Sequence, residues 1–332
     1  NGATSDITLN DLTLNTGTSN SITVDPGRDL ILSSTINAGN GGDVTLGEND
    51  GAVNGDIIAI IDGLNITGAD DVLFQNPGSV SIDNGNFTVD ATGAITIASP
   101  GDIDLDESNS PTAGALNLTT DGSGGGTDIT LTGTTITDAT DITLSARAGT
   151  VTNAPTLQID SVNGDIIFEQ NGGITVNDTF LGGTTSEVDL SLRSSSNTVT
   201  INTTSPLTLN SLAITGFDVA ISQNVTTDSG GITMTSIRNT NDMTVGDTGS
   251  GFFLSNTEIA LLTIITSASN LTLIADNTGR DISISGVTST ATENVGDVLV
   301  QTQGTVVFNG TDNVFDDSII VQAEDGITVN TS

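Results

Sequence analysis

The tetrapeptides Asp128-Ile129-Thr130-Leu131 and Asp141-Ile142-Thr143-Leu144 decide the fold of this chain. Each places an apolar residue, a threonine and a second apolar residue directly after an aspartate. Such alternation is the pattern of a half-buried β-strand, whose apolar pair faces the core while the threonine faces outward. Asp, Asn and Gly separate these segments, and all three residue types favour turns. We therefore expect short strands joined by tight turns.

The same motif recurs along the whole chain, led by Asp or by Gly. Further copies begin at Asp6, Asp43, Gly173, Gly231, Asp281, Asp297 and Gly326. Of the 332 residues only 3% are aromatic, with no Trp, Tyr or Cys, so the landmarks of a β-sandwich core are missing. Interchangeable Ile, Leu and Val instead suit coils stacked on one another. The sequence predicts an all-β fold, a parallel β-helix (β-solenoid), with residues 1–332 forming a single elongated segment.

Charge excludes several classes of partner. Forty-one Asp and Glu residues oppose five basic residues, giving a net charge of -36. Nucleic-acid binding requires clusters of Lys and Arg, so we expect no nucleic-acid partner. Anionic lipid surfaces are disfavoured for the same reason. No apolar run is long enough to span a bilayer, and we expect no membrane insertion.

One segment departs from the strand pattern. Ser255 and Glu258 have the spacing of a capping box, in which the two side chains bond the backbone at a helix start. We expect one short helix near residues 255–262, laid over a coil. Phe252 or Phe253, directly upstream, is expected to seal the contact.

This region also carries a family resemblance. The segments Phe253-Leu254-Ser255-Asn256-Thr257-Glu258-Ile259, Leu271-Thr272-Leu273 and Gly279-Arg280-Asp281-Ile282-Ser283-Ile284 resemble a block of filamentous-haemagglutinin-like bacterial β-strand-repeat surface adhesins. The specific match is limited to about residues 252–285. It implies a right-handed β-helix that is exported, displayed at the cell surface and part of a much longer polypeptide.

Catalysis is not expected. General acid-base chemistry commonly uses His, Lys, Tyr or a carboxylate pair, and the chain has none of the first three. Asp102, Asp104 and Asp106 lie on one strand face, and paired carboxylates hydrolyse glycosides in some β-helix enzymes. Saccharide sites usually add aromatic platforms, which are scarce here. A glycan-degrading enzyme is therefore only a remote alternative.

Metal binding would involve hard cations with oxygen ligands, because Cys and His are absent. The glycine-rich stretches before Asp43 and Asp128 weakly resemble calcium-binding repeats. Stacked coils would also align Asp residues in like-charge rows. The weak metal candidates are Asp43, Asp102, Asp104, Asp106 and Asp128, and the hypothesis is loose Ca²⁺ binding with no other cofactor.

The outward threonines raise one further possibility, since some ice-binding solenoids display threonine arrays. Here most strands show a single central threonine, as at Thr45 and Thr143. Threonine is a good strand former and stacks well on threonine of the next coil. We therefore expect stacking and no ice binding.

Two functional classes remain. The first is a structural rod, filament or stalk segment of an extracellular, cell-surface protein. The alternative is an adhesin that binds glycans or a partner cell through loops leaving the solenoid, with candidates at residues 48–55, 106–115 and 180–187. Uncapped solenoid ends expose strand edges. We expect end-to-end self-association or continuation of the same polypeptide.

Overall fold

The computed structural model describes only part of the chain. The described residues are 7–9, 12–13, 21–24, 30–32, 35–47, 57–59, 64–75, 80–82, 87–91, 95–98, 103–104, 116–120, 129–132, 135–139, 142–146, 151–153, 158–161, 165–176, 188–237, 243–266, 269–276, 279–310 and 312–330. The chain divides into two compact units. Unit 1 comprises residues 1–171 and 179–183, and unit 2 comprises residues 172–178 and 184–332.

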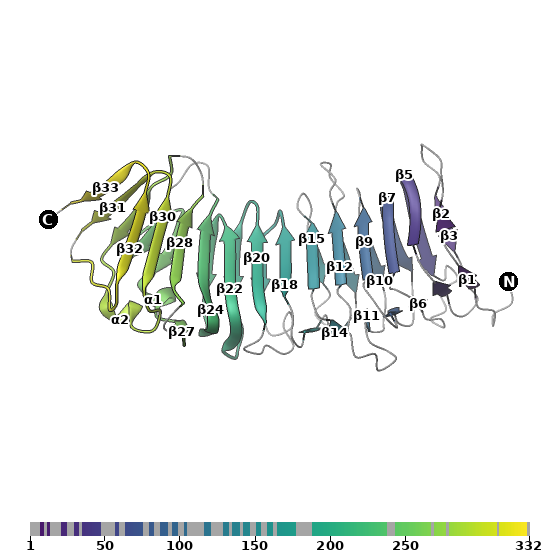
Figure 1. The fold of residues 1–332 in the computed structure, drawn as a ribbon, viewed down its shortest axis with the longest axis horizontal. Coiled ribbons are helices and arrows are strands. Elements are labelled where there is room, and N and C mark those ends of the chain that lie inside the picture. Colours follow the sequence, from purple (N-terminus) through teal and green to yellow (C-terminus); the bar gives the residue numbers. More distant parts are fainter. Residues whose placement is uncertain are drawn as a thin grey trace. The chain divides into compact units, whose positions relative to one another are not determined.

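Unit 1 consists of parallel strands stacked in three rows, which confirms the predicted β-solenoid. The first row is β1 (Ile7–Leu9), β4 (Leu30–Leu32), β6 (Ile57–Ala59), β8 (Val80–Ile82), β11 (Ile103–Asp104), β14 (Thr135–Ala139) and β17 (Gln158–Ser161). The other two rows are formed by β2 (Leu12–Thr13), β3 (Ile22–Val24), β5 (Thr35–Gly47), β7 (Leu64–Gln75), β9 (Phe87–Ala91), β10 (Ile95–Ala98), β12 (Leu116–Thr120), β13 (Ile129–Thr132), β15 (Ile142–Ala146), β16 (Val151–Asn153) and β18 (Ile166–Gln170). Figure 1 shows β9, β12 and β15 side by side, each paired in parallel with the next.

The core of unit 1 is built from in-register ladders of apolar side chains, nearly all of them aliphatic. In the first ladder, each coil contributes one buried residue, which is the register partner of a buried residue in the next coil. Its members are Ile22, Val44, Val72, Ile95, Ile129 and Val151. A second ladder is Ile36, Ile66, Val89, Leu118, Leu144 and Phe168. Burial of such apolar area is the main stabilising contribution, at about 25 cal/mol per Å². Similar aliphatic volumes at each level explain why the core needs few aromatics.

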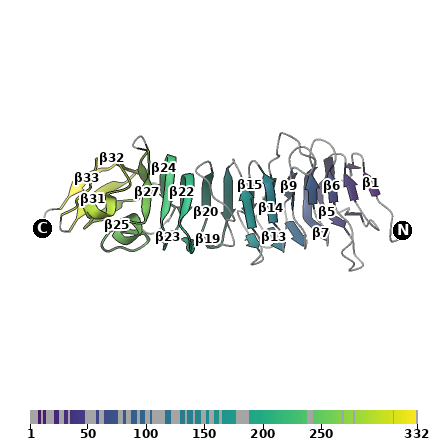
Figure 2. The same ribbon diagram turned by 90° about the horizontal axis from the view of Figure 1, so that it is seen from below.

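Unit 2 has the same construction, and its described residues also include two helices. Its elements are β19 (Ile174–Val176), β20 (Asp189–Ser194), β21 (Thr198–Ile201), β22 (Leu207–Gly216), β23 (Asp218–Ile221), β24 (Val225–Ser236), β25 (Met243–Gly246), β26 (Phe252–Ser255), α1 (Asn256–Ile259), β27 (Leu262–Ile264), β28 (Leu271–Ala275), β29 (Ile282–Ser285), α2 (Ser289–Thr292), β30 (Val298–Thr302), β31 (Thr305–Asn309), β32 (Ile319–Ala323) and β33 (Gly326–Val329). Figure 2 shows β20, β22 and β24 as neighbouring strands.

The strand motif has the orientation that the sequence predicts. In β19, Ile174 and Val176 are buried while Thr175 between them is exposed. Threonines of successive coils are register partners at several levels, such as Thr175 with Thr200 and Thr233 with Thr272. The predicted stacking of threonine on threonine is therefore confirmed at these positions.

A tight return between β25 and β26 interrupts the regular coil. These strands pair in parallel, yet only residues 247–251 join them. Parallel strands normally need a crossover of a dozen or more residues. The short return depends on glycine: Gly246 has φ of 119° and Gly251 has φ of 90°. A Cβ on Gly249 would lie 2.1 Å from Thr244 Oγ1. No pattern in the sequence predicts this return.

The described residues of unit 2 form two short helices, where one was predicted. The predicted helix is α1. The second, α2, begins after Thr288, whose hydroxyl accepts a 3.3 Å hydrogen bond from Ala291 N–H. Asn256 of α1 links the two, because its Nδ2 donates to Gly286 O at 2.9 Å and its Oδ1 accepts from Thr288 N–H at 3.4 Å.

Candidate functional site

The corner at α1 has the geometry predicted for Ser255 and Glu258. Ser255 Oγ accepts a hydrogen bond from Glu258 N–H at 3.2 Å. In return, Glu258 Oε2 accepts from Ser255 N–H at 2.9 Å and from Ser255 Oγ–H at 2.8 Å. Both halves of the capping box are therefore present, and the helix prediction is confirmed. Phe252 is fully buried, whereas Phe253 is half-buried.

Glu258 also acts beyond its own helix. The three-stranded sheet β19-β21-β23 and the five-stranded sheet β26-β25-β29-β31-β33 are separate, although β23 lies against β26. At this break Glu258 Oε1 accepts from Ile221 N–H of β23 at 3.1 Å. Asp218 Oδ1 of β23 accepts from Phe253 N–H of β26 at 3.0 Å. Two carboxylates thus satisfy backbone donors where the strand ladder is interrupted, and this role is structural.

The predicted metal candidates are not brought together by the described residues. Asp43 is exposed, and its Oδ1 accepts from Asp71 N–H of the next coil at 3.4 Å. Asp104 ends β11, with Ser81 and Thr137 as its register partners. The side chain of Asp104, together with Asp102, Asp106 and Asp128, lies outside the described residues.

Within that described part, no group of three Asp, Glu, His or Cys residues could hold a metal ion. The contact between Asp43 and Asp71 does show two acidic residues at neighbouring levels. The Ca²⁺ hypothesis therefore stays a prediction. The loops predicted at 48–55, 106–115 and 180–187 also lie outside the described residues.

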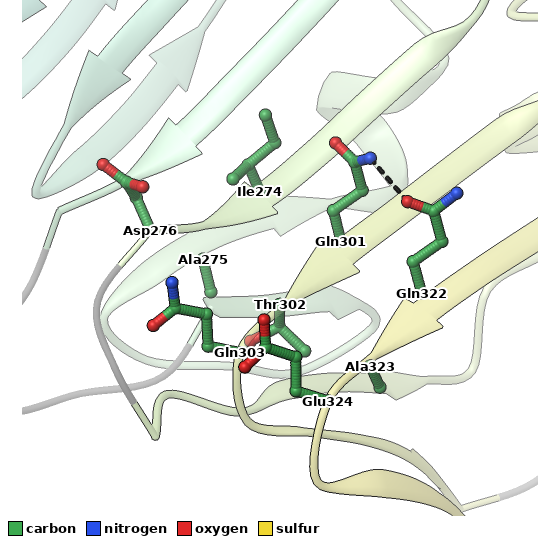
Figure 3. A pocket seen from close by; sticks show the side chains of 9 residues that line it. All are labelled: Ile274, Ala275, Asp276, Gln301, Thr302, Gln303, Gln322, Ala323 and Glu324. Atoms are coloured by element: carbon green, nitrogen blue, oxygen red, sulfur yellow. Dashed lines mark hydrogen bonds between the residues drawn. The ribbon is translucent and has the colours of Figure 1, made fainter.

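A groove on unit 2 is the candidate binding site, and no sequence motif predicts it. It has a volume of about 440 Å³ and crosses the ends of β28, β30 and β32. Its lining residues are Ile274, Ala275, Asp276, Gln301, Thr302, Gln303, Gln322, Ala323 and Glu324. Figure 3 shows the Gln301 and Gln322 side chains side by side on adjoining strands. Gln301 Nε2 donates to Gln322 Oε1 at 2.8 Å.

The chemistry of this groove is that of hydrogen bonding to a polar ligand. Three amides supply both donors and acceptors, and Asp276 and Glu324 supply acceptors when ionised. The Thr302 hydroxyl is already engaged, because it donates to Arg280 O and accepts from Gly304 N–H at 3.1 Å. The polar groups that remain for a ligand are therefore the amides and the carboxylates.

Comparison of the chain with family models, curated proteins and solved structures gives no match. Among the helices in the described part of the chain, none has the length and hydropathy to cross a membrane.

Proposed function

We propose that this chain is a structural, non-catalytic rod or stalk segment of an extracellular surface protein. The β-solenoid supports this proposal, because apolar ladders run through consecutive coils in each unit and make each coil a support for the next. The net charge of -36 suits a solvated exterior, and the chain has no His, Cys or Tyr to serve catalysis.

The observation that carries the proposal is the exposed apolar face of β33. This strand is the edge of the five-stranded sheet. Ile327 is the register partner of the fully buried Val306, yet Ile327 itself is 55% exposed. Val329 is 67% exposed. An apolar strand edge of this kind is a template for further strands. We propose that a β layer from a second copy of this chain packs on β33.

Sedimentation analysis of the chain tests this proposal. The wild-type chain should self-associate, and replacing Ile327 and Val329 with Lys should abolish association because charges block strand addition. Ile265→Lys is the matched control, since Ile265 is 64% exposed but does not lie on β33. A wild-type chain that sediments as a monodisperse monomer would contradict the proposal, as would equal loss of association in the control.

The adhesin alternative rests on loops outside the described residues, and it stays a prediction. Deleting those loops distinguishes the two functions. An adhesin would lose attachment to its target while the solenoid stays folded, whereas a structural rod would change only in assembly or length.

A further inference from the structure

The groove at β28, β30 and β32 is formed by equivalent positions of three successive coils. Ile274, Gln301 and Gln322 are register partners, and the next position on each strand also lines the groove. Asp276 and Glu324 directly follow β28 and β32. Neighbouring strands lie about 4.8 Å apart, so that interval separates Gln301 from Gln322 and also applies to the polar residues just after the three strands, which are Asp276, Gln303 and Glu324. The groove therefore offers a periodic row of hydrogen-bonding groups.

Several of these groups have capacity left for a ligand. The hydrogen bond between Gln301 and Gln322 does not use the carbonyl oxygen of Gln301 or the amino group of Gln322, so both groups can bond a ligand. Gln303 is exposed, and so are Asp276 and Glu324. The side chains of these three have no hydrogen-bond partner among the described residues. Figure 3 shows Gln303 and Glu324 near one another below the Gln301–Gln322 pair.

The lining selects a ligand class by elimination. An anion would meet Asp276 and Glu324 in a chain of net charge -36, which is unfavourable. An apolar ligand would find few apolar contacts and would bury polar groups without partners, at a cost. A cation would use the two carboxylates but not the amide N–H donors. A neutral polyhydroxylated ligand carries donors and acceptors in alternation and uses all of these groups.

We propose that this groove binds a short stretch of a neutral polysaccharide, laid across the three coils. One sugar ring is comparable in length to the spacing between strands, so successive sugars meet successive polar levels. None of the lining residues is aromatic, so stacking contributes nothing and we expect a single groove to bind weakly. This binding surface belongs to the coils themselves and adds a contact function to the structural segment.

Saturation-transfer NMR on the full chain tests the proposal. The probes are cellotetraose, chitotetraose and maltotetraose, with pentalysine as a cationic comparison. We expect at least one tetrasaccharide to bind, with little dependence on salt. The double variant Gln303→Ala/Gln322→Ala should bind about tenfold more weakly, because each neutral hydrogen bond contributes modestly. Gln223→Ala, on another part of unit 2, should leave binding unchanged.

Two checks keep the test decisive. Melting curves by circular dichroism should show the wild type and each variant fully folded at the temperature of the binding assay, so that loss of binding is not loss of folding. The proposal is overturned if no tetrasaccharide binds, or if binding is the same in the double variant as in Gln223→Ala. It is also overturned if pentalysine alone binds, with strong salt dependence and loss in Asp276→Asn/Glu324→Gln, because the groove then takes a cationic peptide.

Discussion

Replacing Glu258 with glutamine perturbs a single side chain that bonds two separate parts of unit 2. The two carboxylate oxygens of Glu258 bond different partners. Oε2 accepts from the N–H and hydroxyl of Ser255, and Oε1 accepts from Ile221 N–H. Glutamine keeps the shape but has one carbonyl oxygen and one amino group. It can therefore serve either Ser255 or Ile221, and the other backbone donor faces an amino group.

The expected cost follows from the bonds that are lost. A buried donor left without an acceptor costs about 1–3 kcal/mol. Because Glu258 is only half-buried, water relieves part of this cost, and we expect about 1–2 kcal/mol. A unit of this size loses roughly 2–4 °C in melting temperature per kcal/mol. The variant should therefore melt about 2–8 °C below the wild type.

Two measurements check this prediction. Circular dichroism gives the melting temperature, and amide hydrogen exchange reports locally on the N–H groups of Ile221 and Ser255, one of which should exchange faster. Glu293→Gln is the matched control, because Glu293 is exposed at the C-cap of α2. If Glu258→Gln has the same melting temperature as the control, and amide exchange at Ile221 and Ser255 is unchanged, then Glu258 does not join the two sheets.

Three further predictions concern stability. Thr227 Oγ1 is buried with no hydrogen-bond partner in the described part of the chain, and Thr227 lies in register between Leu209 and Ile264. Thr227→Val should therefore raise the free energy of unfolding by about 1 kcal/mol, and with it the melting temperature. A lower melting temperature would count against this packing. Gly249→Ala should melt below Gly279→Ala, since the added Cβ would meet Thr244 Oγ1 at Gly249, whereas at Gly279 it meets no atom within 4 Å and the cost is only the strain of alanine at φ of 71°. Equal losses would show that the return is packed differently. If acidic rows bind Ca²⁺, millimolar calcium should raise the melting temperature relative to chelator at constant ionic strength, and an unchanged value would remove the hypothesis.

Strand identity and facing were predictable because they depend on local alternation. The motif at 173–176 predicted a strand with Thr175 outward, and β19 has that pattern. Alternation from Val225 also places Thr227 inward, but the motif does not predict a buried hydroxyl that has no hydrogen-bond partner in the described part of the chain. The number of strands in each coil was likewise not predictable, since it depends on which turns reverse the chain.

The two helices differ in how well the sequence predicts them, again because the prediction depends on local signals. The start of α1 was predictable because both capping partners, Ser255 and Glu258, lie within four residues. The start of α2 carries only half of that signal: Thr288 caps the helix, but Ala291 stands at the position where the capping box needs Glu or Gln. The sequence therefore predicts one helix where the described part of the chain forms two.

The groove could not be predicted, because it depends on register between distant coils. Ile274, Gln301 and Gln322 become neighbours only once the connections between β28, β30 and β32, which differ in length, set their alignment. The same holds for Glu258 and Ile221. Contacts within a motif follow from the sequence, whereas contacts between coils require the structure.

Disulfide trapping tests the parallel, in-register stacking of coils most directly. The chain has no cysteine, so each engineered pair is free of background. Cysteines at the register partners Thr175 and Thr200 should form an intrachain disulfide on oxidation, and so should cysteines at Thr23 and Thr45 in unit 1. Cysteines at Thr175 and Thr198, two positions out of register, should stay reduced because their Cα atoms lie beyond roughly 7 Å. Equal cross-linking of the out-of-register pair, or none in the register pairs, would contradict the solenoid.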